Sequence, residues 1–220
     1  MGMVIDGKWI DDDAKFRNPT GGAFVRAESV FRDRITADGS SGFKAEKGRY
    51  HLFLAPSCPW AHRTQIVRRL KGLEGAISAT LSDLPRVRSW AYSKGIDELQ
   101  PGKNGILELH EVYIAADPNY SGRVTVPTLW DREKKTIVNN ESSEIIRMLN
   151  TEFDAWAEND LPDLYPEARR AEIDALNKRI YETINNGVYR CGFAKTQEAY
   201  EEFIYPMFET LDFLEDRLST

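Results

Sequence analysis

The sequence is poor in cysteine and lacks any long hydrophobic run. Only Cys58 and Cys191 are present among its 220 residues, too few for the disulfide framework of a small secreted protein. No apolar stretch approaches the roughly 18 residues needed to span a bilayer, and no positively charged start with an apolar core predicts a secretory signal. We therefore expect a soluble, cytoplasmic protein.

Basic charge and histidine are also scarce. The 29 Lys and Arg residues are outnumbered by 35 Asp and Glu residues, and the formal net charge of −6 argues against a general affinity for nucleic acid or an anionic membrane. The three histidines, His51, His62 and His110, share no ligand spacing with a cysteine or a carboxylate pair, so we predict no metal site. The remaining composition is that of an ordinary globular protein, long enough for two small domains.

The most informative segment is LFLAPSCPWAHR, from Leu52 to Arg63. An apolar strand ends just before Cys58, Pro59 suits the first position of a helix, and the apolar residues after it recur at helical spacing. Cys58 is thus predicted at a helix N-terminus, where partial positive charge and free N–H groups favour the thiolate and lower the pKa of the thiol. The spacing is that of a thioredoxin Cys-x-x-Cys with Ala61 in place of the second cysteine, so an external thiol must resolve any mixed disulfide on Cys58.

Local spacing leaves two alternatives open. A lone cysteine after an apolar run is also typical of a small buried side chain without chemistry. His62, about one helical turn beyond Cys58, is either an acid/base partner or a solvated structural residue.

The chain divides into four predicted parts. Residues 1–48 are rich in loop signals and are interpreted as an arm rather than a packed unit. Residues 49–150 predict an α/β thioredoxin-like domain with an insertion over 83–120, residues 151–165 a linker, and residues 166–220 the first helices of an all-α domain. The thioredoxin-like domain is expected to contain a strand over 50–55, a helix over 59–72 and a strand over 76–81. A long connection over 83–120, two strands over 124–130 and 136–138, and a helix from Asn140 onward are expected to follow.

Pro127 interrupts an apolar, β-branched run, although a proline cannot donate to a sheet ladder. A cis peptide bond between Val126 and Pro127 resolves this conflict. The N–H and C=O groups of Val126 then remain for a peptide-like ligand beside Cys58.

The cluster NNESSE after the last strand predicts a helix N-terminus with Asn140 as its cap. Free N–H groups and Ser142 can hold a carboxylate there, and Glu141 can hold an ammonium. Simple capping of a structural helix explains the cluster equally well.

In the helical part, Gly187–Thr196 is interpreted as the turn between two amphipathic helices. Tyr189 and Phe193 lie on this turn. A tyrosine at a domain junction can present its hydroxyl to a ligand, whereas the other apolar residues of the stripes are interpreted as core.

Taken together, five segments resemble the glutathionyl-hydroquinone reductases, the Xi class of glutathione transferases, from about residue 27 to the end of the chain. They are Ser40–Phe43, Cys58–Arg63, Ser121–Pro127, Asn139–Glu144 and Asn185–Tyr189. The resemblance implies a thioredoxin-like domain followed by an all-α glutathione-transferase domain, glutathione as co-substrate, and a homodimer. The implied reaction reduces glutathionyl-hydroquinones to hydroquinones through a mixed disulfide between Cys58 and glutathione.

The resemblance also implies site residues. Cys58 matches the catalytic thiolate, and Tyr189 matches a tyrosine that lines the hydroquinone pocket. The residues that match glutathione-binding positions are Trp90, Arg123, Val126, Pro127, Glu141 and Ser142, the last two at the γ-glutamyl end.

Members of this family continue well beyond the position of Thr220, so we expect an incomplete all-α domain and leave the activity of this chain alone open. Two other functions compete with the reductase. One is an Omega-like thiol transferase or dehydroascorbate reductase, which would use Cys58 but not need the insertion that carries Trp90. The other is a non-catalytic glutathione-binding fragment.

Overall fold

The computed structural model describes residues 2–11, 24, 28–83, 88–96, 98–99 and 105–219. The chain separates into two compact units, which we describe individually. Unit 1 spans residues 1–12 and 29–164, and unit 2 spans residues 13–28 and 165–220.

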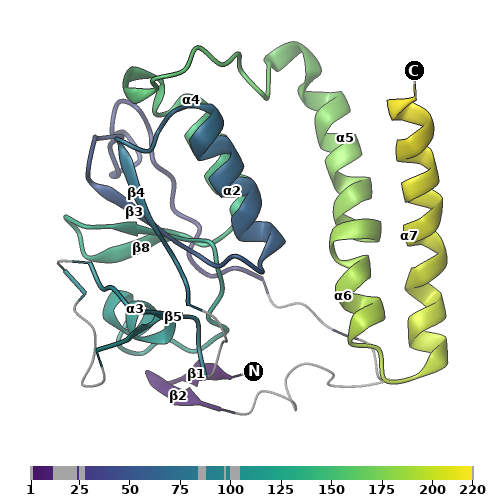
Figure 1. The fold of residues 1–220 in the computed structure, drawn as a ribbon, viewed down its shortest axis with the longest axis horizontal. Helices are drawn as coiled ribbons and strands as arrows, with labels where there is room; N and C mark the ends of the chain where they lie inside the picture. The colour runs from purple at the N-terminus through teal and green to yellow at the C-terminus, as the bar shows by residue number, and fades with distance from the viewer. Residues whose placement is uncertain are drawn as a thin grey trace. The chain divides into compact units, whose positions relative to one another are not determined.

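A four-stranded mixed sheet forms the centre of unit 1 (Figure 1). Its strand order is β4 (Ile77–Leu81), β3 (Tyr50–Leu54), β7 (Thr128–Asp131) and β8 (Thr136–Asn139). β3 runs parallel to β4 and antiparallel to β7, which in turn pairs antiparallel with β8. All five residues of β3 are buried, as expected for a central strand covered on both faces.

Helices cover both faces of this sheet. α2 (Pro59–Leu70) and α4 (Ser142–Thr151) pack against each other on one face, and α3 (Leu109–Ala116) lies on the other (Figure 1). The order β3-α2-β4-α3-β7-β8-α4 is that of a thioredoxin-like domain, which confirms the predicted fold class of this part of the chain. A 3-10 helix, η1 (Asp154–Trp156), follows α4.

The predicted long connection over 83–120 contains regular structure that the sequence analysis missed. Two short strands, β5 (Ala91–Tyr92) and β6 (Leu107–Glu108), pair antiparallel, and α3 begins directly after β6. The Glu111 carboxylate accepts a hydrogen bond from the N–H of Glu108 at 2.8 Å, as in a capping box. The insertion is therefore part of the fold, because three apolar side chains of α3 are fully buried in the core: Leu109, Val112 and Tyr113.

Within the described residues, the prediction that residues 1–48 form an unpacked arm is wrong. Val4, Ile35 and Phe43 are buried in the core of unit 1. These apolar residues are isolated among loop formers, so no periodicity announced their burial. Arg32 forms a bridge with Asn139 at the outer edge of β8, so this part of the chain extends the sheet.

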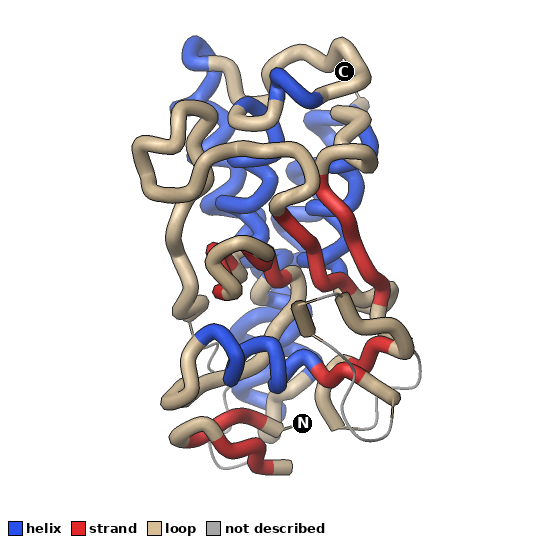
Figure 2. The backbone as a smooth tube through the Cα atoms, turned by 90° about the vertical axis from the view of Figure 1, so that its left-hand side faces the viewer, coloured by secondary structure: helices blue, strands red, loops and turns tan. Residues whose placement is uncertain are grey.

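The strands β1 (Met3–Ile5) and β2 (Lys8–Ile10) form an N-terminal hairpin. This hairpin is attached to the loop after α3, and Figure 2 shows it next to this part of unit 1. Val4 and Gly122 exchange two backbone hydrogen bonds of 2.9 Å. Gly7 at the hairpin turn has a φ of +70°, and a Cβ atom there would lie 2.0 Å from the carbonyl oxygen of Pro118. Only glycine suits this position.

Two predicted details around the later strands need correction. The strand expected over 124–130 begins only at Thr128, after a Val126–Pro127 peptide bond that is cis, as predicted. The N-cap of α4 is Glu141 rather than Asn140, because the Glu141 carboxylate accepts from the N–H of Ser143 at 3.1 Å. The Asn140 side chain is instead buried and makes hydrogen bonds within unit 1.

Unit 2 is helical, as predicted. Its elements are the 3-10 helix η2 (Glu167–Arg169), α5 (Arg170–Ile180), the π-helical turn η3 (Tyr181–Asn185), α6 (Gly187–Gly192) and α7 (Gln197–Leu218). The turn predicted over Gly187–Thr196 is mostly α6, and the chain reverses only in its last four residues. Thr196 caps α7 by accepting from the N–H of Ala199 at 3.2 Å.

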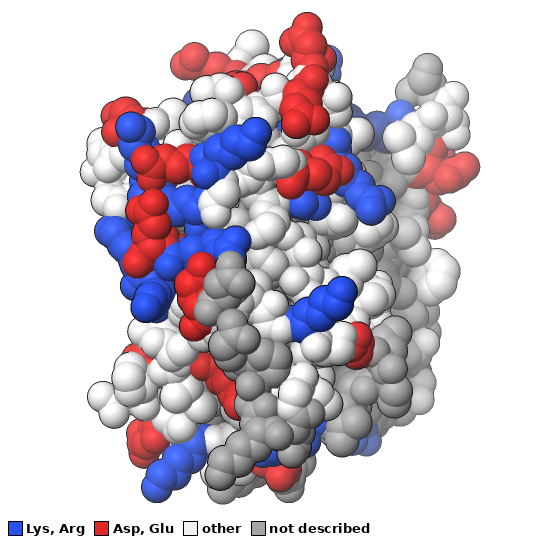
Figure 3. Space-filling model, turned by 60° about the vertical axis from the view of Figure 1, so that its left-hand side comes forward, with Lys and Arg blue, Asp and Glu red and all other residues white. Residues whose placement is uncertain are grey.

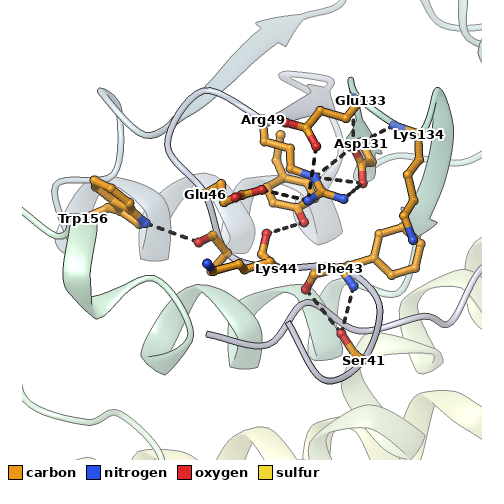
Figure 4. A network of polar contacts seen from close by, with 11 residues as sticks. Ser41, Phe43, Lys44, Glu46, Arg49, Asp131, Glu133, Lys134 and Trp156 are labelled. Atoms are coloured by element: carbon orange, nitrogen blue, oxygen red, sulfur yellow. Dashed lines mark hydrogen bonds and ion pairs between the residues drawn. The ribbon is translucent and has the colours of Figure 1, made fainter. Parts of the chain in front are cut away.

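The charged side chains of unit 1 include one buried ion pair, shown in Figure 4. Arg49 precedes β3, and its Nη2 lies 2.6 Å from Oδ2 of Asp131, a carboxylate with no exposed surface at the end of β7. The same guanidinium contacts Glu46 at 2.8 Å and the exposed Glu133 at 3.4 Å. The hydrogen bond to Asp131 is the main cause that raises the pKa of Arg49. This pair anchors the loop before β3 to the sheet.

The charged surface is mixed in sign. On the described part of the face shown in Figure 3, Lys and Arg side chains lie interspersed with Asp and Glu side chains. Within the described ranges, no helix has the length and apolar character needed to cross a membrane.

We expect Arg49→Met to lower the free energy of unfolding by about 3–5 kcal/mol, because it leaves the Asp131 carboxylate buried without its cation. Urea unfolding followed by tryptophan fluorescence measures this loss. Glu133→Ala is the matched control: it removes an exposed partner of the same arginine and should change stability by less than about 0.5 kcal/mol. Equal effects of the two variants would contradict this assignment.

Candidate functional site

Cys58 lies between β3, the central strand of unit 1, and α2. It is the N-cap residue of α2, has an extended backbone, and is followed by Pro59 in the first helical position. The N–H of Cys58 donates to the Ala55 carbonyl at 3.2 Å, and the Cys58 carbonyl accepts from the N–H of His62 at 2.9 Å. The predicted position at a helix N-terminus is confirmed, and the half-buried Cys58 lies at the positive end of the helix dipole.

The thiol of Cys58 also meets the segment that precedes β7. Its Sγ donates to the carbonyl oxygen of Val126 at 3.4 Å. Val126 and Pro127 are both buried, and the cis peptide bond joins them. The site therefore combines a cysteine at the N-cap position of a helix with the backbone of Val126, which is the combination expected from the sequence.

A second group of polar residues gathers at the N-terminus of α4. Arg63 of α2 donates from Nε and Nη2 to the Ser142 hydroxyl oxygen, at 3.0 Å and 2.6 Å. The same guanidinium lies 3.6 Å from the Glu141 carboxylate and stacks over the Trp60 ring at 5.0 Å. Ser29 adds a hydrogen bond to Glu141 at 3.2 Å. Arg63 thus connects α2, the helix that Cys58 precedes, to Glu141 and Ser142, the two residues predicted to bind the γ-glutamyl end of glutathione.

Two further predicted residues, Trp90 and Arg123, lie in segments that precede strands. Trp90 is half-buried against the core just before β5, and its carbonyl accepts from the N–H of Leu109 at 2.8 Å. Arg123 is half-buried in the segment before β7, and its carbonyl accepts from the Tyr120 hydroxyl at 2.7 Å.

Tyr189 belongs to unit 2, on α6. Its ring stacks with Phe24 and Phe193 at centroid distances of 6.2 Å and 6.4 Å. Phe24 and Phe193 are themselves 5.2 Å apart, so the three rings form one aromatic cluster. Phe24 was not recognised in the sequence because it stands alone in a loop-rich stretch.

The histidines are separate from one another and differ in environment. His51 is buried in β3, where desolvation, followed by the charges of Arg132 and Arg68, lowers its pKa to about 3. His62 is exposed on α2. His110 lies on α3 beside Glu108, and burial lowers its pKa. Among the described residues, no group of three or more His, Cys, Asp or Glu side chains is arranged to hold a metal ion.

Arg63 and Asn140 are two residues near the site whose contacts the sequence did not predict. Arg63 follows Cys58 within one motif, but its contact with Ser142 depends on how α2 packs against α4. Asn140 has the residue type of a helix cap, and this local signal concealed its role inside the domain.

Residues 57–152 match the family model described as glutathione S-transferase, N-terminal domain. The match starts one residue before Cys58 and ends just after α4, so it contains both halves of the site. Fold and site therefore define a domain of the glutathione transferase class.

Known relatives narrow this class. The chain is 52% identical over 223 residues to the glutathionyl-hydroquinone reductase PcpF of Sphingobium chlorophenolicum, covering 100% of this chain and 68% of the relative. The structure of a Xi-class glutathione transferase from Natrialba magadii superposes with a TM-score of 0.84 at 42% identity, over 100% of this chain and 66% of that one. The glutathione-bound structure of YqjG, a glutathione transferase homologue from Escherichia coli K-12, gives 0.81 at 44% identity, over 98% and 66%.

The chain belongs to the glutathionyl-hydroquinone reductases, the Xi class of the glutathione transferases. The resemblance recognised in the sequence is confirmed. The chain spans about two thirds of the length of these relatives.

We expect iodoacetamide to alkylate Cys58 at least about tenfold faster than Cys191 at neutral pH. The helix N-terminus favours the Cys58 thiolate, whereas burial raises the pKa of Cys191 and so reduces its thiolate fraction. Peptide mass spectrometry across a pH series gives both rates, and the midpoint for Cys58 should lie at the lower pH. Faster alkylation of Cys191 would contradict the assignment, and Cys191→Ser should leave the Cys58 rate unchanged.

Proposed function

We propose that this protein reduces glutathionyl-hydroquinones to hydroquinones, with glutathione as co-substrate. The Cys58 thiolate attacks the sulfur of the glutathionyl group, and the bond between that sulfur and the ring carbon breaks. The ring carbon retains the electron pair and takes up a proton, which yields the free hydroquinone. Cys58 is left in a mixed disulfide with glutathione.

A second glutathione completes the cycle. Its thiolate attacks the glutathione sulfur of the mixed disulfide, releases glutathione disulfide, and regenerates the Cys58 thiolate. Ala61 supports this route, because it occupies the position at which a thioredoxin-type resolving cysteine would stand.

The observation that carries the proposal is the position of the Cys58 thiol, at a helix N-terminus and 3.4 Å from the Val126 carbonyl. An extended peptide beside Val126 can make main-chain hydrogen bonds there while its own sulfur faces Cys58. This arrangement suits a cysteine-containing peptide such as glutathione.

The remaining site residues follow from the family relationship. We assign glutathione binding to Trp90, Arg123, Val126, Pro127, Glu141 and Ser142. The Arg123 guanidinium suits a carboxylate, and the paired Glu141 and Ser142 suit the ammonium and carboxylate of the γ-glutamyl end. Tyr189, within its aromatic cluster, is assigned to the wall that receives the hydroquinone ring.

Two further points are proposals of the same kind. The protein is a homodimer, and its location is the cytoplasm. An Omega-like thiol transferase or dehydroascorbate reductase would share Cys58. Side-by-side turnover of a glutathionyl-hydroquinone, dehydroascorbate and a mixed disulfide distinguishes these activities.

Cys58→Ala should abolish turnover of a glutathionyl-hydroquinone while glutathione binding remains measurable by calorimetry. The variant lacks the nucleophile but keeps the Val126 backbone and the α4 N-terminus. Cys191→Ser is the matched control and should retain turnover close to that of the parent protein. Turnover of the glutathionyl-hydroquinone by Cys58→Ala would contradict the mechanism.

Ala61→Cys should produce an intramolecular disulfide with Cys58 and remove the need for a second glutathione at that step. Residue 61 follows the N-cap by one helical turn and faces the interior, with 1% of its surface exposed. Mass spectrometry of the oxidised variant distinguishes the disulfide from a glutathione adduct. Ala61→Ser, the matched control, should give the adduct; finding only the adduct in Ala61→Cys would refute the prediction.

A further inference from the structure

The side chain of Asn140 lies inside unit 1 and contacts three separate segments. Its Nδ2 donates to the Tyr113 hydroxyl at 3.0 Å and to Oγ1 of Thr125 at 3.3 Å. Its Oδ1 accepts from the N–H of Phe31 at 3.2 Å. Only 6% of the Asn140 surface is exposed. Both Nδ2 hydrogens and the carbonyl oxygen of the amide are therefore used inside the protein.

Two of these contacts converge on Thr125, the residue before Val126. The Tyr113 hydroxyl lies 3.0 Å from the Thr125 carbonyl oxygen and 3.3 Å from the Thr125 N–H. The Thr128 hydroxyl donates to the same carbonyl at 2.7 Å. Because β7 begins only at Thr128, side chains rather than a neighbouring strand hold the backbone of Thr125.

Asn140 is also the residue directly before Glu141, the N-cap of α4. Its own backbone is fixed as well, because its N–H donates to the Phe31 carbonyl at 3.1 Å and its carbonyl accepts from the Ser29 hydroxyl at 3.3 Å. One residue thus connects the segment that presents Val126 to the helix terminus that presents Glu141 and Ser142.

We propose that Asn140 is a positioning residue for glutathione, with Tyr113 as its partner: the amide sets the separation between the Val126 backbone and the N-terminus of α4. This inference rests on the proposed function, because it assumes that these two groups bind the same molecule. A peptide that spans two sites binds well only if both are held at the correct separation, so a small displacement costs affinity. In this role Asn140 acts through these two groups rather than through a contact of its own with glutathione.

The test uses Asn140→Leu, which keeps the approximate volume but removes the hydrogen bonds, and Tyr113→Phe, which removes one hydroxyl. Each variant has a matched control in unit 1. Asn150→Leu changes a buried asparagine at the other end of α4. The Asn150 side chain donates to the Asp163 carboxylate and accepts from the N–H of Leu164. Tyr50→Phe removes a buried hydroxyl that donates to the Lys44 carbonyl.

Glutathione dissociation constants are measured by calorimetry well below the melting temperature of each variant, together with kcat and KM. Asn140→Leu should weaken glutathione binding about tenfold or more and raise KM more than it lowers kcat. Tyr113→Phe should act in the same direction, and the double variant should bind no more weakly than Asn140→Leu, because the two residues form one network. Both controls should lower the melting temperature yet keep the dissociation constant within about twofold.

Folded Asn140→Leu and Tyr113→Phe variants with parental glutathione affinity would overturn the inference, and so would equal losses of affinity in the two controls. If Asn140→Leu does not fold, Tyr113→Phe decides alone. Turnover by the parent protein tests the proposed function separately. A parent protein that binds glutathione without reducing a glutathionyl-hydroquinone would refute that function and leave the binding test of Asn140 intact.

Discussion

The backbone just before β7 is not yet part of the sheet, so its buried polar groups need partners other than a neighbouring strand. Pro127 has no N–H to give to the ladder, and the regular pairing of β7 starts at Thr128. Side chains of Tyr113 and Thr128 supply the missing partners. The position of Val126 beside the Cys58 thiol therefore depends on a polar core network that joins α3 to the start of α4.

The central strand β3 connects two different kinds of polar site. At its beginning, Arg49 and the buried Asp131 carboxylate form an ion pair that fixes the entering chain. At its end, Cys58 caps α2 without any side-chain capping bond. Between them, five buried residues keep the strand in place. The charge at one end is thus neutralised by a buried ion pair, while the thiol at the other end donates to the Val126 carbonyl.

Features that depend on neighbouring residues in the sequence could be predicted. Cys58 followed by Pro59 gave the helix terminus, and Pro127 in an apolar run gave the cis bond. Asn140 was wrongly predicted as a cap because asparagine is a preferred cap residue, whereas its amide is used by partners that lie 15 and 27 positions away. Such long-range demands are not visible in a local pattern.

Other structural features that the sequence analysis did not predict have related causes. α3 has only eight residues and begins directly after a two-residue strand, so its helical period covers little more than two turns. The burial of Val4 and Ile35 involves single apolar residues, which carry no period at all. The contact of Arg63 with Ser142 requires the packing of α2 on α4, which is a tertiary property.

The two hydrogen bonds from Arg63 to Ser142 have a chemical consequence. A free hydroxyl group can both donate and accept, so by itself it does not distinguish a carboxylate from an ammonium. Here the guanidinium occupies both lone pairs of the oxygen, and the hydroxyl hydrogen is what remains for an approaching group. Ser142 is thereby limited to donating, while the neighbouring Glu141 carboxylate can only accept. The adjacent pair therefore offers one donor and one acceptor, the reverse of the polarity of an amino-acid zwitterion.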